Sequence, residues 1–194
     1  QELVPGDFGG RGPVRAKAIW LSSGRLLAPG SLEEGGWRSF VDRSDDEGLT
    51  WIKSNEVYAR LRPIKNASPV ISDIPVSDQS FHGRGVIQPT IWESAEGVHM
   101  MMRSSEGYIY RSDSYDAGES WCEAYPTQLP NNNSGIDVVR ACDGLLYLLC
   151  NPVGVNWGPR SPLCLLCSAD NGNSWRQMMA METLLSNIMT SLRL

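Results

Sequence analysis

The chain has 194 residues, of which 41% are hydrophobic and 20% are charged, and its formal net charge at pH 7 is −5. This composition is typical of a globular protein with a sizeable core and not of a disordered chain. The negative charge argues against a nucleic-acid-binding protein, which would carry a clustered basic face. The longest apolar run, 145–150, is far shorter than the roughly 20 residues of a membrane-spanning helix. We expect no nucleic-acid partner and no membrane span.

Turn signals divide the chain into three stretches with one shared pattern. In each stretch two strands flank a glycine turn, a third strand leads into a polar loop, and a fourth strand leaves from a tryptophan. The expected strands before the fourth are 14–20, 25–28 and 38–43, then 86–92, 98–103 and 108–112, and finally 136–140, 145–150 and 163–167. The loop-rich stretch 60–80 separates the first unit from the second.

The polar loop before each fourth strand has the frame S-x-D-x-G-x-[ST]-W. It is SDDEGLTW at 44–51, SYDAGESW at 114–121 and SADNGNSW at 168–175. The serine and aspartate side chains can accept hydrogen bonds from backbone N–H groups of their own loop, and the glycine allows a positive φ. We therefore assign these octets a structural role, the closing of a hairpin, in preference to catalysis. The structural residues are Asp46, Gly48, Trp51, Asp116, Gly118, Trp121, Asp170, Gly172 and Trp175.

Four-stranded units that repeat along a chain are typical of β-propeller blades, of which about four to eight close a ring. The expected fold class is all-β: three four-stranded antiparallel blades at about 12–58, 84–127 and 134–180. Three blades cannot close a ring, and an open flank would expose apolar surface. We therefore expect a partial propeller at 12–180 that needs the missing blades of its own full-length chain. The stretch 181–194 abandons the pattern, as a truncated or frame-shifted tail would.

The strand order predicts which end of the blades carries the polar residues. The glycine turns and the octets lie at one rim, so first strands begin, second strands end and third strands begin at the opposite rim. Several blades converge there on a single ligand position. The polar residues expected at this rim are Arg15, Lys17, Gln88, Arg103, Asp137, Asn151 and Arg160.

Four of these rim residues are cations, in a protein that is acidic overall. Arginine binds carboxylates through two parallel hydrogen bonds, so the cluster favours an acidic carbohydrate as the ligand. The alternative interpretation is that each cation forms an ordinary surface ion pair. The carboxylates available for such pairs are Glu33, Glu34, Glu106 and Asp137.

Histidines and cysteines are few. His82 lies on a glycine-rich loop, 80–85, where a general acid or base and a plain loop residue fit equally well. His99 lies inside an expected strand and is interpreted as structural. Cys164 and Cys167 are three residues apart on an expected strand, so their thiols point to opposite faces and cannot share a metal ion. We expect buried free thiols at these two positions, although Cys150 and Cys164 could face each other on neighbouring strands, and we expect no metal and no cofactor.

The octets resemble the Asp-box (BNR) repeats of the sialidase superfamily, whose members are mostly six-bladed propellers. The stretches 85–121 and 129–152 are similar to the branch known as BNR-repeat neuraminidase-like proteins, and the resemblance covers about 12–180. It implies an aspartate acid on an early loop, a tyrosine nucleophile assisted by a glutamate, and three arginines that bind the substrate carboxylate. Arg15 matches the first of these arginines, without the family's R-I-P signature. The early loop carries Glu33 and Glu34 and no aspartate.

The resemblance and the basic rim together predict a carbohydrate-active enzyme of the sialidase-like superfamily. It would be an exo-sialidase-type hydrolase that cleaves the glycosidic bond to an acidic sugar, sialic or uronic. Glu33 or Glu34 would be the protein acid, and Arg15, Arg103 and Arg160 would bind the carboxylate. We expect an extracellular or periplasmic location for such an enzyme, and we expect the fragment alone to be inactive.

Two other functions fit the same rim. A polysaccharide lyase acting on uronate-containing glycans would use His82 as the base, with Lys17 and the arginines neutralising the carboxylate. A non-catalytic Asp-box propeller would bind a glycan or a protein without turnover. The sequence leaves the choice between these alternatives open, as well as the substrate and the linkage.

Overall fold

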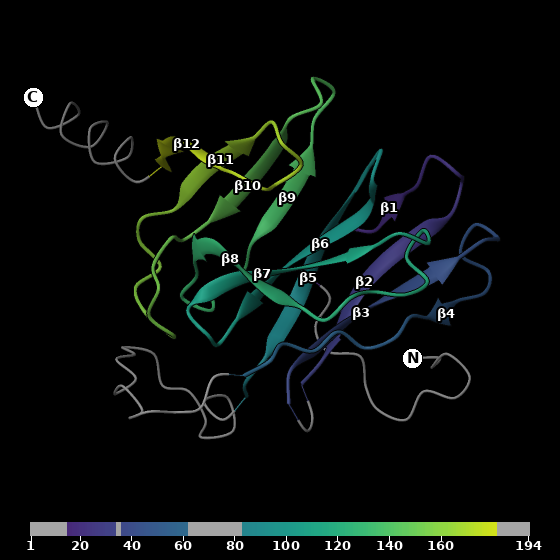
Figure 1. The fold of residues 1–194 in the computed structure, drawn as a ribbon, viewed down its shortest axis with the longest axis horizontal. Coiled ribbons are helices and arrows are strands. Elements are labelled where there is room, and N and C mark those ends of the chain that lie inside the picture. The colour runs from purple at the N-terminus through teal and green to yellow at the C-terminus, as the bar shows by residue number, and fades with distance from the viewer. Residues whose placement is uncertain (1–14, 34–35, 62–82, 182–194) are drawn as a thin grey trace, which may run out of the picture.

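A computed structural model of the chain describes residues 15–33, 36–61 and 83–181. Its strands form three four-stranded antiparallel sheets, so the predicted all-β fold is confirmed (Figure 1). In each sheet the hydrogen-bonded neighbours are consecutive in the chain, which makes every sheet a simple meander. No helix in the described residues is long and apolar enough to cross a membrane.

The strand boundaries follow the three predicted units. Sheet 1 contains β1 (Ile19–Trp20), β2 (Leu26–Leu32), β3 (Arg38–Ser44) and β4 (Ile52–Lys53). Sheet 2 contains β5 (Val86–Ser94), β6 (Gly97–Ser104), β7 (Tyr108–Ser114) and β8 (Tyr125–Pro130). Sheet 3 contains β9 (Asp137–Arg140), β10 (Leu146–Cys150), β11 (Cys164–Ser168) and β12 (Arg176–Ala180).

Two strands of sheet 1 differ from the prediction. The expected first strand, 14–20, is a strand only at Ile19–Trp20 within the described residues. The expected second strand, 25–28, continues to Leu32 and pairs with β3 along its whole length. The pattern suggested an earlier end because Pro29 and Gly30 are usual turn residues. Gly30 serves packing instead, because a Cβ at this position would lie 2.6 Å from Cζ of the Phe40 ring.

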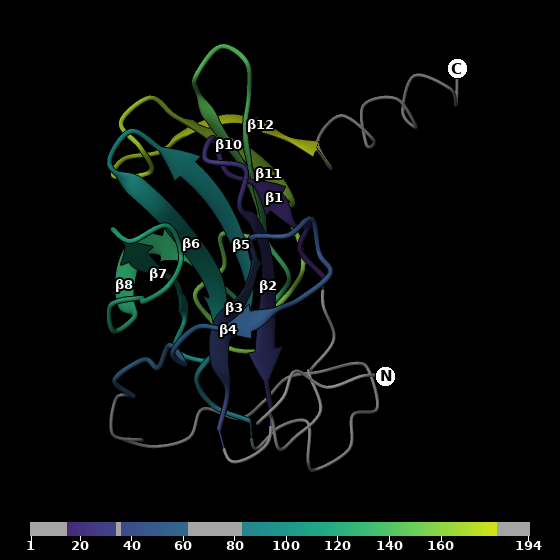
Figure 2. The same cartoon turned by 90° about the vertical axis from the view of Figure 1, so that its right-hand side faces the viewer.

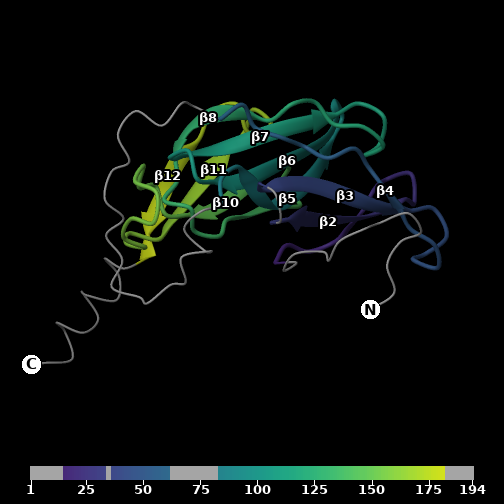
Figure 3. The same cartoon turned by 90° about the horizontal axis from the view of Figure 1, so that it is seen from below.

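Sheet 2 lies between sheet 1 and sheet 3, as Figure 3 shows. Its first strand, β5, contacts β2 on one side and β9 on the other, and β5 and β2 run next to each other in Figure 2. Alternation along β6 supplies both interfaces, since Met100 and Met102 pack in the core shared with sheet 1, while Met101 packs in the core shared with sheet 3. The sheets therefore follow one another in space in the order of the sequence.

The three octets fold identically. In each, the serine hydroxyl donates to the aspartate Oδ1 at 2.7 Å and accepts the glycine N–H. The aspartate Oδ1 accepts the N–H of the threonine or serine four residues later, and the tryptophan Nε1 donates to the glycine carbonyl. The octet glycines have φ values of 81° to 90°. Hydrogen bonds from the loop's own threonine or serine lower the pKa of Asp46 and of Asp170 to about 2. The loops therefore use their carboxylates to close hairpins.

Candidate functional site

The structure forms a cleft of about 350 Å³ at the end of the sheets that lies away from the octets. Its walls come from the segment before β1, the beginnings of β5 and β9, the end of β10 and the segment before β11. We call it the arginine cleft. The predicted rim residues that line it are Arg15, Gln88, Asp137, Asn151 and Arg160. Five of the seven predicted binding residues therefore meet in one place, although they are distributed over the whole chain.

Arg103 is the last residue but one of β6 and is not among the residues that line this cleft, and only 8% of its surface is exposed. Its guanidinium carbon lies 5.7 Å from the centroid of the Trp37 ring, a cation–π contact. Burial is the largest cause that lowers the pKa of Arg103; together with the charges of Arg15 and Arg160, and against the opposing charge of Glu33, it brings the pKa to about 10. Arg103 therefore stays cationic at neutral pH. It lies close enough to Arg15 and Arg160 for their positive charges to lower its pKa.

These three cations lack anionic partners in the described part of the chain. Neither Arg15, Arg103 nor Arg160 forms an ion pair there with an acidic residue. The Nε atom of Arg103 is buried without any hydrogen-bond partner among the described residues. A buried charge normally has a partner, so the environment of Arg103 in the described chain calls for an explanation.

The carboxylates considered as ion-pair partners of the rim cations form no ion pair with Arg15, Arg103 or Arg160 in the described residues. Asp137 accepts a hydrogen bond from Lys17 Nζ at 2.6 Å, and Glu106 pairs with Arg84 at 2.8 Å. Glu33 is exposed directly after β2 and influences the pKa of Arg103. The remaining predicted partner, Glu34, falls outside the described residues. Lys17 is thus an ion-pair partner of Asp137, and it is not among the residues that line the arginine cleft.

Asn151 was predicted to bind ligand, but its amide is occupied by the protein. Its Nδ2 donates to the carbonyls of Arg160 and Pro162, and its Oδ1 accepts the hydroxyl of Ser134. Asn151 therefore fixes the segment that carries Arg160, so we describe it as a positioning residue.

The polar segment 131–134, which was not among the predicted site residues, supports the same part of the cleft. Asn132 Nδ2 donates to the carbonyls of Gly158 and Pro159, next to Arg160, and Asn132 Oδ1 accepts the backbone N–H of Ser134. All four residues of the segment are buried. The run of three asparagines and a serine directly before a strand was the available signal, because such side chains hydrogen-bond local backbone.

The predicted catalytic residues are only partly placed. Glu34 and His82 lie outside the described residues, so no geometry relates them to the cleft. His99 is 1% exposed, and its two ring nitrogens lie 2.6 Å from Asp113 Oδ1 and 2.8 Å from Ser94 Oγ. The Asn171 amide nitrogen also lies 3.0 Å from His99 Nε2. His99 thus sits in a buried network between sheet 2 and the third octet, in agreement with a structural role.

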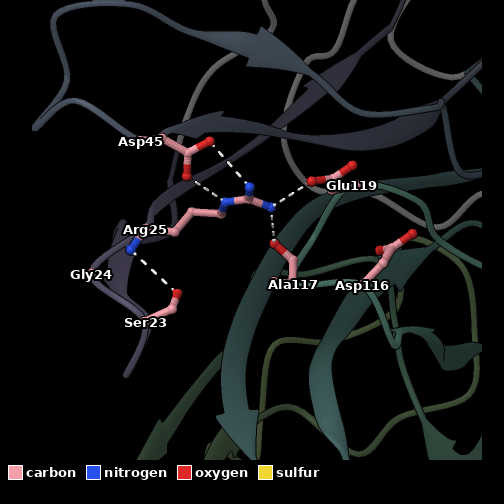
Figure 4. A pocket seen from close by; sticks show the side chains of 7 residues that line it. All are labelled: Ser23, Gly24, Arg25, Asp45, Asp116, Ala117 and Glu119. Atoms are coloured by element: carbon pink, nitrogen blue, oxygen red, sulfur yellow. Dashed lines mark hydrogen bonds and ion pairs between the residues drawn. The ribbon is translucent and has the colours of Figure 1, made fainter.

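A second cleft, of about 320 Å³, lies at the octet end of the sheets, between residues of sheet 1 and residues of the second octet (Figure 4). The guanidinium of Arg25 extends across it, bonding both carboxylate oxygens of Asp45, one oxygen of Glu119 and the carbonyl of Ala117. The joint between sheet 2 and sheet 3 uses the equivalent octet position, where Arg111 donates to the carbonyl of Asn171 at 2.7 Å. This second cleft is therefore a joint between sheets.

Comparison with known proteins identifies the family to which this architecture belongs. A family model described as a BNR repeat-like domain matches residues 1–187. No curated protein matches the chain.

Several solved structures are similar to the chain. A Dyadobacter fermentans protein of unknown function is 15% identical with a TM-score of 0.59, and the match covers 84% of this chain and 40% of that one. The K499G mutant of NanB sialidase from Streptococcus pneumoniae is 18% identical with a TM-score of 0.52, covering 82% and 22%. Trypanosoma rangeli sialidase, in complex with the inhibitor DANA, is 17% identical with a TM-score of 0.55, covering 84% and 24%.

The chain spans less than half the length of these structures, and identities this low show a shared fold alone. The family model, in contrast, matches nearly the whole chain and agrees with the three octets and the three meandering sheets. The chain belongs to the family of BNR repeat-like domains and has the fold of the sialidase β-propellers.

Proposed function

We propose that the arginine cleft binds the carboxylate of an acidic sugar, and that the protein is a sialidase-like glycoside hydrolase acting outside the cytoplasm. The observation that carries this proposal is the convergence of Arg15, Arg103 and Arg160, none of which forms an ion pair with a carboxylate of the described residues. A bound carboxylate would supply the missing negative charge and would accept paired hydrogen bonds from the guanidinium groups. The sialidase fold of the similar structures supports the same class of ligand.

The proposed chemistry assigns a different task to each side of the cleft. The arginines hold the sugar by its carboxylate, and the segment around Asn151 fixes the position of Arg160. A carboxylic acid from the loop after β2, Glu33 or Glu34, would protonate the leaving oxygen of the glycosidic bond. Turnover would also need a nucleophile or a base, which we propose comes from parts of the propeller outside this chain.

A binding protein without turnover is the second candidate, favoured by one observation. Asp137 is the only carboxylate among the described residues that line the cleft, and it is already paired with Lys17. A cleft whose lining carboxylate is already ion-paired, beside several arginines, is suited to holding an acidic glycan. The lyase alternative depends on His82, which lies outside the described residues.

Binding and turnover of sialic acid test these two candidates together. Titration calorimetry with N-acetylneuraminate should show binding to the unmodified chain and at least a tenfold weaker affinity for Arg160→Ala, because a charge-assisted bond contributes about 1.5–3 kcal/mol. Arg60→Ala is the matched control, since Arg60 is 88% exposed and its nearest carboxylate oxygen, on Glu123, lies 3.8 Å away. Equal affinities for the unmodified chain and Arg160→Ala would refute carboxylate binding by the arginines.

Release of methylumbelliferone from its sialoside by the full propeller would then separate the enzyme from the binder. Turnover that is lost in either Glu33→Gln or Glu34→Gln supports the hydrolase. Binding without turnover supports the second candidate.

A further inference from the structure

Gln88 is a residue of the arginine cleft whose features neither carboxylate binding nor the fold accounts for. Only 8% of its surface is exposed, and its Oε1 atom has no hydrogen-bond partner among the described residues. A buried side-chain carbonyl is nearly always bonded in a folded protein, so an unpaired one calls for an explanation. Gln88 lines the cleft together with Arg15 and Arg160.

The backbone at Gln88 is unusual as well. Its φ is 55°, and it is the only non-glycine residue with a positive φ inside a strand of the described chain. The left-handed region is unfavourable for a residue with a Cβ, and the following Pro89 restricts the backbone further. The pairing of β5 with β6 also shifts register between Ile87 and Thr90, so a bulge surrounds this residue. Bulges redirect side chains, and strained backbone concentrates at functional positions.

Neighbouring contacts hold this bulge in place. The Thr90 hydroxyl donates to Asp137 Oδ1 at 2.9 Å and accepts the backbone N–H of Val138 at 3.0 Å, which ties β5 to β9. Asp137 is in turn bound by Lys17. The carboxylate of the cleft therefore has donors already, whereas the carbonyl oxygen of Gln88 has none among the described residues.

The chemistry of the cleft is thus divided between two kinds of group. The arginines offer only hydrogen-bond donors, and Gln88 Oε1 offers only an acceptor. A plain carboxylate would satisfy the arginines and leave Gln88 unpaired. A ligand that also carries a hydroxyl or an amide N–H would satisfy both.

We propose that Gln88 forms an uncharged subsite beside the arginines, where its Oε1 accepts a hydrogen bond from a ligand hydroxyl or amide N–H. The cleft then selects hydroxylated or amide-bearing acids over simple carboxylates. This inference rests on the proposed carboxylate binding and deepens it, because it names what the ligand carries besides the carboxylate.

Two kinds of probe test the subsite with the 194-residue chain. The donor-bearing acids are D-glucuronate and N-acetylneuraminate, and cyclohexanecarboxylate is the acid without a donor. The unmodified chain should bind at least one donor-bearing acid about fivefold to tenfold more tightly than cyclohexanecarboxylate, which is the worth of one hydrogen bond. Gln88→Leu, of similar volume, should lose this preference while its affinity for cyclohexanecarboxylate stays the same. Gln177→Leu, at an exposed glutamine of β12, is the matched control and should keep the preference.

Gln88→Gly separates a ligand-binding role from a structural one. Glycine adopts a positive φ without strain, so this variant should unfold at a higher temperature than the unmodified chain and still lose the preference. A lower unfolding temperature for Gln88→Gly would overturn the assignment of strain.

The outcomes for the two proposals differ. If all three acids bind and Gln88→Leu keeps the unmodified preference, the subsite is refuted and the carboxylate site stands. If none of the acids binds to the unmodified chain, the proposed function and the subsite are refuted together.

Discussion

Replacing the buried arginine by a neutral side chain should stabilise the protein while removing its ligand binding. Arg103 is 8% exposed, and its pKa falls from 12.5 to about 10, primarily because of burial and secondarily because of the charge of Arg15. A shift of this size corresponds to about 3 kcal/mol against the charged form. The cation–π contact with Trp37 offsets about 1 kcal/mol of this unfavourable free energy. Arg103→Met should therefore raise the free energy of unfolding by about 2 kcal/mol.

Urea unfolding at neutral pH, in a buffer without carboxylates, measures this change. The midpoint should rise in Arg103→Met with an unchanged m-value, since the surface exposed on unfolding is nearly the same. Arg160→Met is the control: Arg160 is exposed, so its stability should change by no more than about 0.5 kcal/mol.

A saturating acidic sugar provides the second half of the test. At 100 times its dissociation constant, a ligand stabilises the folded state by about 2.7 kcal/mol. The unmodified chain should gain this stability and Arg103→Met should not. A loss of more than about 1 kcal/mol in Arg103→Met without ligand would refute the reasoning, because it would mean that the guanidinium is satisfied in the free protein.

Three further predictions concern the joints, the acid stability and the thiols. Arg111→Met removes the cation bonded to buried Asp113 and to the Asn171 carbonyl, so it should cost about 3–5 kcal/mol in urea unfolding, whereas Arg176→Met at an exposed site should cost little. Burial raises the pKa of Asp113, but hydrogen bonds from His99, Tyr125 and Arg111 outweigh it and hold the pKa at about 2. Because this folded-state pKa lies below the unfolded one, the carboxylate's stabilisation is present above about pH 4 and disappears as the pH falls towards about 2; Asp113→Asn should remove this part of the acid dependence. Ellman's reagent should label two thiols in the folded protein and all five in denaturant, with burial raising the pKa of Cys150 to about 12. The exposed thiols are Cys122 and Cys142, and the buried ones are Cys150, Cys164 and Cys167.

Much of the fold could be predicted from sequence because its signals are local. Each octet is a closed unit in which the serine, the aspartate and the glycine satisfy one another, so its conformation hardly depends on the rest of the chain. Apolar runs between such loops give strands, and strands in fours give meandering sheets. The limits of β2 could not be predicted in the same way, because Gly30 is a strand residue only on account of the Phe40 ring above it.

The candidate site was predictable in outline and unpredictable in detail. Register counting brought Arg15, Gln88 and Arg160 to one rim, and all three line the cleft. Lys17 and Asp137 are 120 positions apart in the sequence, so no local sequence pattern predicts that these two residues form the ion pair. The bulge at Gln88 likewise depends on how β5 pairs with β6 and meets β9.

The distinction between structural and ligand-binding polar groups follows from these long-range contacts. The amide of Asn151 bonds the segment that carries Arg160 through its nitrogen and Ser134 through its oxygen, whereas the carbonyl of Gln88 has no partner in the described chain. Both residues have the same side-chain chemistry and stand at the same rim. Only their surroundings assign one to positioning and the other to ligand.

Comparing N-acetylneuraminate with its methyl ester tests the central claim most directly. The two compounds share every hydroxyl and the acetamide, and they differ only at the carboxyl group, where a neutral methyl ester replaces the negative charge that the arginines are proposed to bind. Calorimetric titration of the unmodified chain should give affinity for the acid and at least tenfold weaker affinity for the ester, as the loss of a charge-assisted contact of about 1.5–3 kcal/mol requires. Equal affinities for acid and ester would contradict the account.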